Sequence, residues 1–162
     1  MEVRPFQKSD AVFCFRLRSS AFIEEFYGEL TPQEVSAAVN SYMPEDYIRM
    51  AQETPFFIVE QNGVAVGFFN LKRKDKSTAE LPLIYLALDC LGKGLGSACI
   101  DYIEKWLSAN WTEVETLIVD TVIPKYNSGF YKKVGFKPSV STYCEFLGQK
   151  LRALRLVQKL KD

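Results

Sequence analysis

The apolar positions at the start of the chain follow first a strand and then a helix. Residues 2–6 are predicted to form a short strand. Ser9 and Asp10 then provide a cap for a helix. The apolar residues of this helix fall on one stripe at helical spacing: Phe13, Leu17 and Ala21.

Two more helix starts precede residue 50. In Thr31-Pro32-Gln33-Glu34 a threonine stands at the cap, a proline at the first helical position, and a glutamate three residues after the threonine. This is the pattern of a capping box, in which the two polar side chains bind free N–H groups of the first turn. Pro44-Glu45-Asp46 predicts the start of another short helix.

The period then changes to that of strands. Two apolar, β-prone runs, residues 56–60 and 64–69, flank Gln61-Asn62-Gly63, and Asn-Gly between such runs is typical of a β-hairpin. After a polar turn from Lys72 to Ser77, a third strand is predicted at about residues 79–88. Because this run is apolar on both faces, we expect it to be central in the sheet.

A glycine-rich run, Leu91-Gly92-Lys93-Gly94-Leu95-Gly96-Ser97, joins this strand to an amphipathic helix. One face of the helix is apolar: Leu95, Cys99, Tyr102, Ile103, Trp106 and Leu107. A strand at 114–123, a short helix at 126–134 and a strand at 143–147 follow, whereas the pattern of 151–160 fits either a strand or a helix. The order β-α-α-β-β-β-α-β-α-β-β predicts one mixed α/β domain over residues 1–162.

Charge and apolar run lengths exclude several classes of protein. Twenty basic residues balance 20 acidic ones, which argues against a nucleic-acid coat and a polybasic membrane binder. The longest apolar run, residues 81–88, is far too short to span a bilayer, and the first ten residues hold no signal core. We therefore expect a soluble, cytoplasmic protein with no nucleic-acid or membrane partner.

The residue types limit the chemistry. The four cysteines, Cys14, Cys90, Cys99 and Cys144, lack metal-knuckle spacing, and the chain has no histidine. A His-Cys zinc site and histidine-dependent triads are therefore excluded, and we expect no metal. Cysteines scattered in apolar contexts are typical of reduced core residues. Any proton transfer must use Asp, Glu, Tyr, Cys, Lys or water.

The glycine-rich run has the properties of an anion site. Glycine permits positive φ and close approach of a ligand, and a first helical turn presents unpaired N–H groups. A Walker A loop is disfavoured because no Gly-Lys-Ser/Thr occurs. A dinucleotide site is disfavoured because the third glycine comes one residue early and a hairpin precedes the run. A tight turn that holds no ligand is a further alternative.

Two segments resemble the GNAT superfamily of acyl-CoA-dependent N-acetyltransferases. Residues 84–97, IYLALDCLGKGLGS, are similar to its strand and loop followed by Q/R-x-x-G-x-G/A, with Gly94 and Gly96 at the two glycine positions. Leu91 stands where the family has Gln or Arg. Residues 127–136, NSGFYKKVGF, are similar to the late helix of the family. The order of elements agrees over the whole chain.

The resemblance implies a mixed sheet splayed around acetyl-CoA, with helices on both faces. It places the pantetheine arm of CoA along the strand backbone at about Leu86 and Leu88, with an N–H near Leu86 at the thioester oxygen. It implies that the pyrophosphate binds the backbone of Leu91, Gly92, Lys93, Gly94, Leu95, Gly96 and Ser97. Asn127 is expected to bind the cofactor or to cap the late helix.

The resemblance also suggests catalytic residues. Tyr131 occupies the position of the general acid that protonates the CoA thiolate, and a core aromatic is the alternative. Glu80 matches the catalytic glutamate of the histone-acetylating members and is a candidate base for an amine whose pKa is ~10. An exposed glutamate at a strand edge, or a base made of water, is the alternative. Four lysines provide a positive field for the CoA phosphates or a solvated helix face: Lys125, Lys132, Lys133 and Lys137.

The acceptor site of the family implies a role for residues 23–30, with Glu24, Glu25, Tyr27 and Glu29, and for residues 143–148. An acidic, aromatic rim suits a cationic amine. We expect direct acetyl transfer, in a ternary complex, to a primary amine of a small molecule or peptide, and the fold is compatible with a homodimer. A GNAT-like acyl-CoA-binding or regulatory protein with little catalysis is the alternative from another class.

Overall fold

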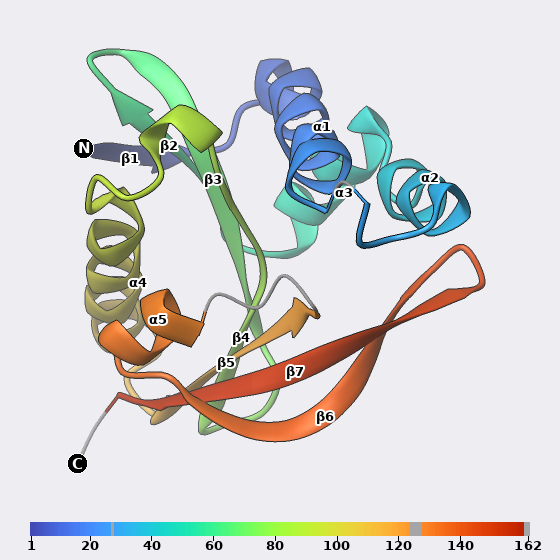
Figure 1. Cartoon of the computed structure of the whole chain (residues 1–162). Helices are drawn as coiled ribbons and strands as arrows, with labels where there is room; N and C mark the ends of the chain where they lie inside the picture. The colour runs from blue at the N-terminus through green and yellow to red at the C-terminus, as the bar shows by residue number, and fades with distance from the viewer. Residues whose placement is uncertain (27, 124–127, 161–162) are drawn as a thin grey trace.

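The computed structural model describes residues 1–26, 28–123 and 128–160, and a seven-stranded sheet runs through it (Figure 1). The strands are β1 (Glu2–Pro5), β2 (Phe56–Gln61), β3 (Val64–Arg73), β4 (Thr78–Leu86), β5 (Thr116–Val122), β6 (Lys137–Phe146) and β7 (Gln149–Lys159). Their order in the sheet is β1-β2-β3-β4-β5-β7-β6, and the β4–β5 pair alone is parallel. The predicted central strand is thus the fourth of seven.

Helices cover both faces of the sheet. They are α1 (Ala11–Ser20), α2 (Pro32–Asn40), α3 (Pro44–Glu53), α4 (Leu95–Asn110) and α5 (Ser128–Lys133). A π-helical turn, η2 (Ala21–Glu25), continues α1, and short 3-10 turns occur at η1 (Lys8–Asp10) and η3 (Leu88–Cys90). Helices α1, α2 and α3 lie on one face and α4 and α5 on the other (Figure 1). Three helices therefore precede the hairpin, in agreement with the three predicted helix starts, although the predicted order of elements counted only two.

Local signals in the sequence are largely confirmed. Thr31 and Glu34 form the predicted capping box at α2, with the Glu34 N–H donating to Thr31 Oγ1 at 3.2 Å. The β2–β3 turn has positive φ at Asn62 (52°) and Gly63 (76°), as an Asn-Gly hairpin requires. The ambiguous segment 151–160 is strand, because it pairs with both β5 and β6 as part of β7.

Asp10 stands at the N-cap position of α1, as predicted, but its side chain makes no cap hydrogen bond to this helix. The chain enters a 3-10 turn first, and the Asp10 carboxylate accepts from the Gln7 N–H at 2.7 Å, three residues earlier. Arg4 also donates to Asp10 at 2.8 and 2.9 Å. The Asp10 carboxylate therefore joins the 3-10 turn η1 to β1 through Arg4, instead of capping α1.

This carboxylate leads to a prediction about acid stability. Burial opposes the ionisation of Asp10, but hydrogen bonds from Arg4 and Gln7 outweigh that cost and lower its pKa from 3.8. A lowered folded-state pKa stabilises the fold above the unfolded value, and the contribution is lost as the pH falls through the folded value. Asp10→Asn should lower the free energy of unfolding by about 2 kcal/mol at neutral pH, and less in acid. Urea unfolding at about pH 7 and about pH 3 measures this; an equal loss at both would contradict it.

Three apolar clusters hold the helices to the sheet. The largest, called the α4 cluster here, joins α4 to β2–β5 and contains the predicted helix residues Leu95, Cys99, Ile103 and Leu107. A second cluster lies under α1 and α3 and includes Tyr47 and Phe68. A third joins η2 and α2 to β5 and β7. Among the described residues, no helix is both long and apolar enough to cross a membrane.

Candidate functional site

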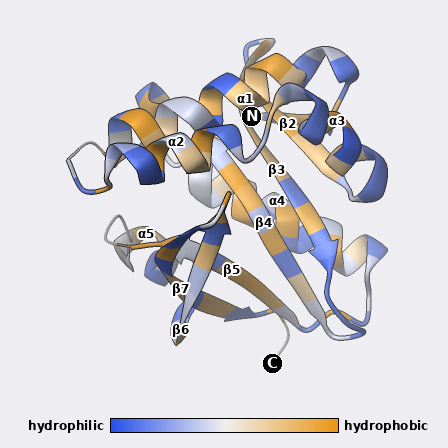
Figure 2. Cartoon of the chain, turned by 90° about the vertical axis from the view of Figure 1, so that its right-hand side faces the viewer, coloured by the Kyte–Doolittle hydropathy of each residue, from blue (hydrophilic) through white to orange (hydrophobic). Residues whose placement is uncertain are grey.

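The two central strands β4 and β5 pair at one end only. Their parallel pairing covers three residue pairs and ends at Glu80 and Ile118. Beyond these residues both strands continue, β4 to Leu86 and β5 to Val122, and they diverge (Figure 2). The predicted splay of the sheet is therefore confirmed. In the described part of the chain, the β4 backbone after Glu80 has no strand partner on its β5 side.

A bulge in β4 lies where the splay begins. The β3–β4 register shifts by one residue between Asn70 and Lys72, so Leu71 faces two residues of β4, Leu81 and Pro82. An extra residue inverts the alternation of side chains along a strand. The alternation of side chains between the two faces of β4 is therefore inverted after the bulge. The alternation of N–H groups between the two edges of the strand is inverted with it.

Beyond the bulge, the Leu86 N–H faces the open side of β4. The N–H of the next residue, Ala87, donates to the Val66 carbonyl of β3 at 2.8 Å. Because successive peptide groups of a strand point to opposite edges, the Leu86 N–H points toward β5. The strand ends there, two residues earlier than predicted. Leu88 begins η3, where its carbonyl accepts from the Leu91 N–H at 3.2 Å, so Leu88 belongs to a turn and not to the strand edge.

The glycine-rich run forms the turn between η3 and α4. Gly92 and Gly94 have positive φ, of 74° and 82°, and Gly94 is the N-cap of α4. No atom lies within 4 Å of the place where a Cβ would stand on either glycine. The two glycines are thus required by backbone conformation, and the space beside them is open. Leu91, at the position of the family's Gln or Arg, is 48% exposed.

The N-terminus of α4 has no side-chain cap, unlike that of α2, where Thr31 accepts from the Glu34 N–H. In α2 and α3 the Glu34 and Asp46 carboxylates accept N–H groups at the cap position. In α4, which has 16 residues, Gly94 offers no side chain and the first turn has no acidic residue. A helix end of this kind carries about half a positive charge and several unpaired N–H groups. The N–H groups of Leu95, Gly96 and Ser97 are therefore suited to bind an anion.

Gly96 allows α5 to pack against this helix end. A Cβ on Gly96 would lie 2.7 Å from the Phe130 ring. The neighbouring Tyr131 ring is half-buried and contacts Phe130 and Phe136, at centroid distances of 5.0 and 5.6 Å. Tyr131 also packs against the α4 cluster, together with Leu86. The structure thus brings the predicted acid to the same side of the sheet as the cradle and the end of β4.

Glu80 lies on the other face of the sheet. Its neighbours Ala79 and Leu81 are both buried in the α4 cluster, so the Glu80 side chain points toward the face that α1–α3 cover. It is half-buried and is the last residue of β4 that pairs with β5. Glu80 and Tyr131 therefore flank the splay from opposite faces, as a base and an acid that act on opposite partners would.

More charged groups lie near Glu80 on that face. Arg155 of β7 donates to both carboxylate oxygens of Asp120 of β5, each at 2.8 Å. The hydrogen bonds to Asp120 raise the pKa of Arg155, and Glu80 adds to the effect by its charge. Burial raises the pKa of the Cys144 thiol, and the Asp120 and Glu80 charges raise it further, whereas Arg18 lowers it. These residues form a polar cluster on the face opposite α4.

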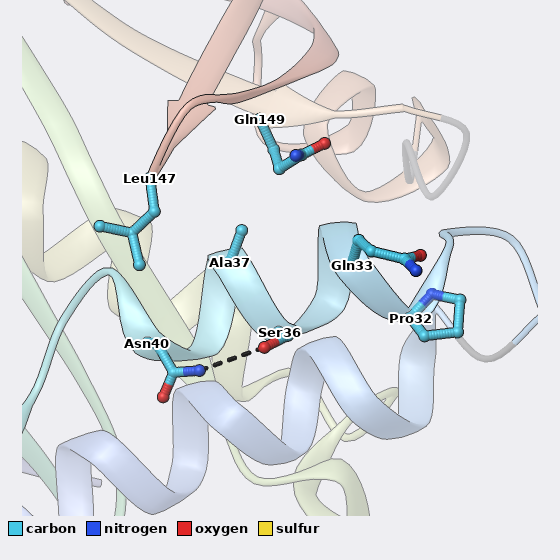
Figure 3. Close-up of a pocket in the computed structure, with 7 residues that line it drawn as sticks. All are labelled: Pro32, Gln33, Ser36, Ala37, Asn40, Leu147 and Gln149. Carbon is cyan, nitrogen blue, oxygen red and sulfur yellow. Dashed lines mark hydrogen bonds between the residues drawn. The ribbon is translucent and has the colours of Figure 1, made fainter.

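The predicted early and late segments of the acceptor site do come together. Phe26 and Leu30 of the early segment pack in one apolar cluster with Cys144 and Phe146 of the late segment. Phe22, which directly precedes the early segment, forms an edge contact with Phe146 at 5.7 Å. A shallow cavity of about 470 Å³ lies between α2 and the β6–β7 turn (Figure 3). Its lining is uncharged: Pro32, Gln33, Ser36, Ala37, Asn40, Leu147 and Gln149. A second cavity, of about 480 Å³, has both acidic and basic residues in its lining: Glu29, Leu30, Glu34, Ile123, Lys150, Leu151 and Arg152.

The predicted acidic rim therefore also contains cations, since Lys150 and Arg152 line the same cavity as Glu29. Neither cavity is lined by the cradle, by Glu80 or by Tyr131. Both cavities lie between α2 and β7, next to the segments predicted for the acceptor site and not next to the cradle.

Some predicted residues lie outside the described part of the chain. These are Tyr27, Lys125 and Asn127. The side chain of Glu25 is also outside it. The described lysines Lys132, Lys133 and Lys137 are exposed, at the end of α5 and the start of β6. No group of three or more His, Cys, Asp or Glu side chains among the described residues is placed to hold a metal ion.

Comparison with known families agrees with this geometry. The model of the acetyltransferase (GNAT) family matches residues 20–136. The chain belongs to the GNAT acetyltransferase family. The match includes both resembling segments, the cradle and the late helix. No match was found among curated protein sequences.

Solved GNAT structures share the fold over nearly the whole chain. A GCN5-related N-acetyltransferase from Rhodopseudomonas palustris has a TM-score of 0.82 and 19% identity, and the match covers 98% of this chain and 94% of that one. PaiA N-acetyltransferase from Thermoplasma acidophilum, in complex with coenzyme A, has a TM-score of 0.79 and 18% identity, and the match covers 98% of each chain. YncA from Salmonella typhimurium, with acetyl-CoA, has a TM-score of 0.65 and 17% identity, and the match covers 100% of this chain and 95% of that one.

One buried residue of the face that α1–α3 cover was not predicted from the sequence. Arg18 is 1% exposed, and it lies on the most buried side of α1 together with Ala11 and Cys14. The predicted stripe of Phe13, Leu17 and Ala21 is half-buried and lies beside it. Ala11, Cys14 and Arg18 recur at helical spacing, so the sequence places an arginine on an apolar face of the helix. This pattern was the signal from which the burial of Arg18 could have been predicted.

Proposed function

We propose that this protein is an N-acetyltransferase that transfers the acetyl group of acetyl-CoA directly to a primary amine in a ternary complex. The observation that carries the proposal is the open edge of β4 at Leu86, five residues before the uncapped glycine cradle of α4. Acetyl-CoA supplies the thioester that donates the acyl group. The coenzyme A and acetyl-CoA present in the PaiA and YncA structures support this choice of donor.

The cradle and the open strand edge fit the two ends of such a donor. The N–H groups of Leu95, Gly96 and Ser97, beside the positive-φ glycines, are suited to a pyrophosphate. The Leu86 N–H would donate to the oxyanion that develops on the thioester oxygen, a contribution of ~3 kcal/mol in a site without water. Leu91 adds no cation, so the backbone N–H groups and the Lys93 side chain within the cradle would provide this recognition.

The two predicted catalytic residues would move protons on opposite faces of the splay. Glu80 would accept a proton from the acceptor amine, directly or through water, on the face that holds Asp120 and Arg155. Tyr131 would donate a proton to the departing thiolate on the α4 side. No covalent acyl-enzyme is needed. Cys90, the cysteine nearest the cradle, is buried in the core, and its pKa is raised by desolvation and by Asp89.

Leu91 offers a gain-of-function prediction. Leu91→Arg would place a guanidinium beside the cradle, where a charge-assisted hydrogen bond to phosphate is worth about 1.5 kcal/mol, so the Kd for CoA should fall roughly tenfold. Val12→Arg is the control, because Val12 is 47% exposed on α1, on the face of the sheet opposite α4, and the variant adds the same charge. Isothermal titration calorimetry with CoA compares the two. Equal changes in both variants would show a general charge effect.

Amine-dependent release of the CoA thiol tests the proposed reaction. The purified protein is given acetyl-CoA with a panel of amino acids, their amides, polyamines and short peptides, and free thiol is measured. The proposal predicts that at least one amine accelerates thiol release and appears N-acetylated by mass spectrometry. CoA binding with no amine-dependent release across the panel would favour the regulatory alternative.

A further inference from the structure

A buried arginine on the acceptor face lacks a charge partner. Arg18 is 1% exposed. Two other partly buried arginines are neutralised by carboxylates: Arg4 pairs with Asp10 and Glu60, and Arg155 pairs with Asp120. Among the described side chains no carboxylate forms an ion pair with Arg18, and its Nε has no hydrogen-bond partner. A buried charge without a partner is expensive, and proteins seldom keep one.

The contacts of Arg18 account for only part of its charge. One terminal nitrogen donates to the Ala38 carbonyl of α2 at 2.6 Å, and the other lies 3.4 Å from Ser41 Oγ. The carbonyl end of a helix is equivalent to about half a negative charge, which leaves the cation incompletely matched. Four aromatic rings surround the guanidinium at 4.7 to 6.0 Å: Phe22, Tyr42, Tyr85 and Phe146. They solvate a cation through their faces but accept no hydrogen bond at Nε.

The position of Arg18 connects it to the splay. Tyr85, one of its four rings, is next to Leu86 on β4. Cys144 packs in one apolar cluster with Tyr85 and Phe146, two of the rings around Arg18. The charges of Arg18, Glu80 and Asp120 all act on the pKa of the Cys144 thiol, as expected for groups on one face of the sheet. Of these charges, Asp120 is matched by Arg155. An acidic candidate base and an unmatched cation therefore remain on the same face.

We propose that Arg18 binds an anionic group of the acyl acceptor, so that the acceptor is an amine that also carries a carboxylate, as an α-amino acid does. This inference rests on the proposed function and deepens it. The amine of such a zwitterion would lie toward Glu80 and its carboxylate on the unpartnered Nε edge of Arg18. A carboxylate is the anion that matches a guanidinium in geometry and in charge.

Access to Arg18 requires the acceptor walls to move. The Phe22 and Phe146 rings cover the guanidinium and lie 5.7 Å apart. Phe22 lies in the π-helical turn η2, a local geometry that is frequent at functional sites. Phe146 ends β6 immediately before Leu147, which has a φ of 45°. Separation of the two rings would admit the acceptor, and their return would exclude water from the paired charges.

Matched acid and amide acceptors test this inference. The wild-type protein, Arg18→Gln and the control Arg16→Gln, an exposed arginine of the same helix, are assayed with L-amino acids and with their α-amides. Each pair differs by the carboxylate alone. At neutral pH the amide has more free amine and is intrinsically the better acceptor. A wild-type kcat/KM at least tenfold higher for the acid therefore points to a cationic site. Arg18→Gln should lose that preference at least tenfold, and Arg16→Gln should keep it.

A binding measurement keeps the test independent of catalysis and of folding. Thermal shifts of the wild-type protein are recorded with each acid and amide, with and without CoA. Stabilisation by at least one acid and not by its amide supports the inference. If Arg18→Gln does not fold, Arg18→Lys keeps the charge without the fork and should weaken acid binding selectively. Equal responses to acids and amides, or none to any acid, overturn the role of Arg18. Amine-dependent thiol release with the amides would leave the proposed function intact.

Discussion

Gly94→Asp is expected to weaken CoA binding about 100-fold while leaving the fold intact. Gly94 is the N-cap of α4, with a φ of 82° and open space around the position of a Cβ. Aspartate accepts positive φ better than most residues. Its charge would stand roughly 5 Å from a pyrophosphate on the first turn, which costs about 3 kcal/mol at an effective dielectric constant of about 20. Isothermal titration calorimetry with CoA measures the change.

Two control variants separate charge from backbone strain. Gly94→Asn has nearly the same shape without the charge, and it should lose much less affinity. Gly148→Asp repeats the aspartate substitution at the same φ of 82° and with open space around the Cβ position, in the β6–β7 turn at the other end of the sheet, and should bind CoA as the wild type does. Equal losses in the Asp and Asn variants of Gly94 would mean that the helix end does not bind an anion.

Tyr131→Phe is expected to lower kcat about 100-fold with an unchanged Kd for CoA. A positioned general acid contributes ~10²–10⁴-fold, and the lower end applies because a thiolate is already a fair leaving group, with a thiol pKa of about 8.5. Phenylalanine keeps the ring contacts with Phe130 and Phe136, so α5 should stay in place. Steady-state kinetics with an accepted amine and calorimetry with CoA measure the two quantities.

Tyr102→Phe is the matched control for this substitution. Tyr102 is a half-buried tyrosine of α4 whose ring packs against Phe57 and Phe69, so the loss of its hydroxyl should leave kcat unchanged. A fall in kcat for Tyr131→Phe together with a weaker Kd would indicate a packing role. An unchanged kcat would show that the thiolate leaves without this acid.

The sequence predicted the parts of the fold that depend on local chemistry. The Asn62-Gly63 turn, the Thr31 capping box and the apolar face of α4 each follow from a few neighbouring residues, and all three are present. The glycine cradle could also be predicted, because positive φ at Gly92 and Gly94 is a property of the backbone itself. The extent of β4 could not, since the turn at Leu88 and the apolar strand before it share one hydrophobic pattern.

The parts that the sequence missed depend on contacts between distant segments. The β4 bulge appears only when β3 is paired beside it, and it decides which face Glu80 and Leu86 serve. The Asp120–Arg155 pair joins residues 35 positions apart. Arg18 looks like a surface residue of α1 until α2, β4 and β6 close around it. Partners on separate elements cannot be read from periodicity, which describes one element at a time.

Ligand-dependent thermal unfolding of the wild-type protein tests the central claim most directly. The protein is heated with CoA, acetyl-CoA, NAD or ATP at saturating concentrations. Binding at a hundredfold the Kd stabilises a fold by ~2.7 kcal/mol, and for a domain of this size that raises the Tm by roughly 5–10 °C. We expect this rise with CoA and acetyl-CoA and not with NAD or ATP. The absence of a shift with saturating CoA would contradict it and would leave the glycine cradle as a turn that binds no ligand.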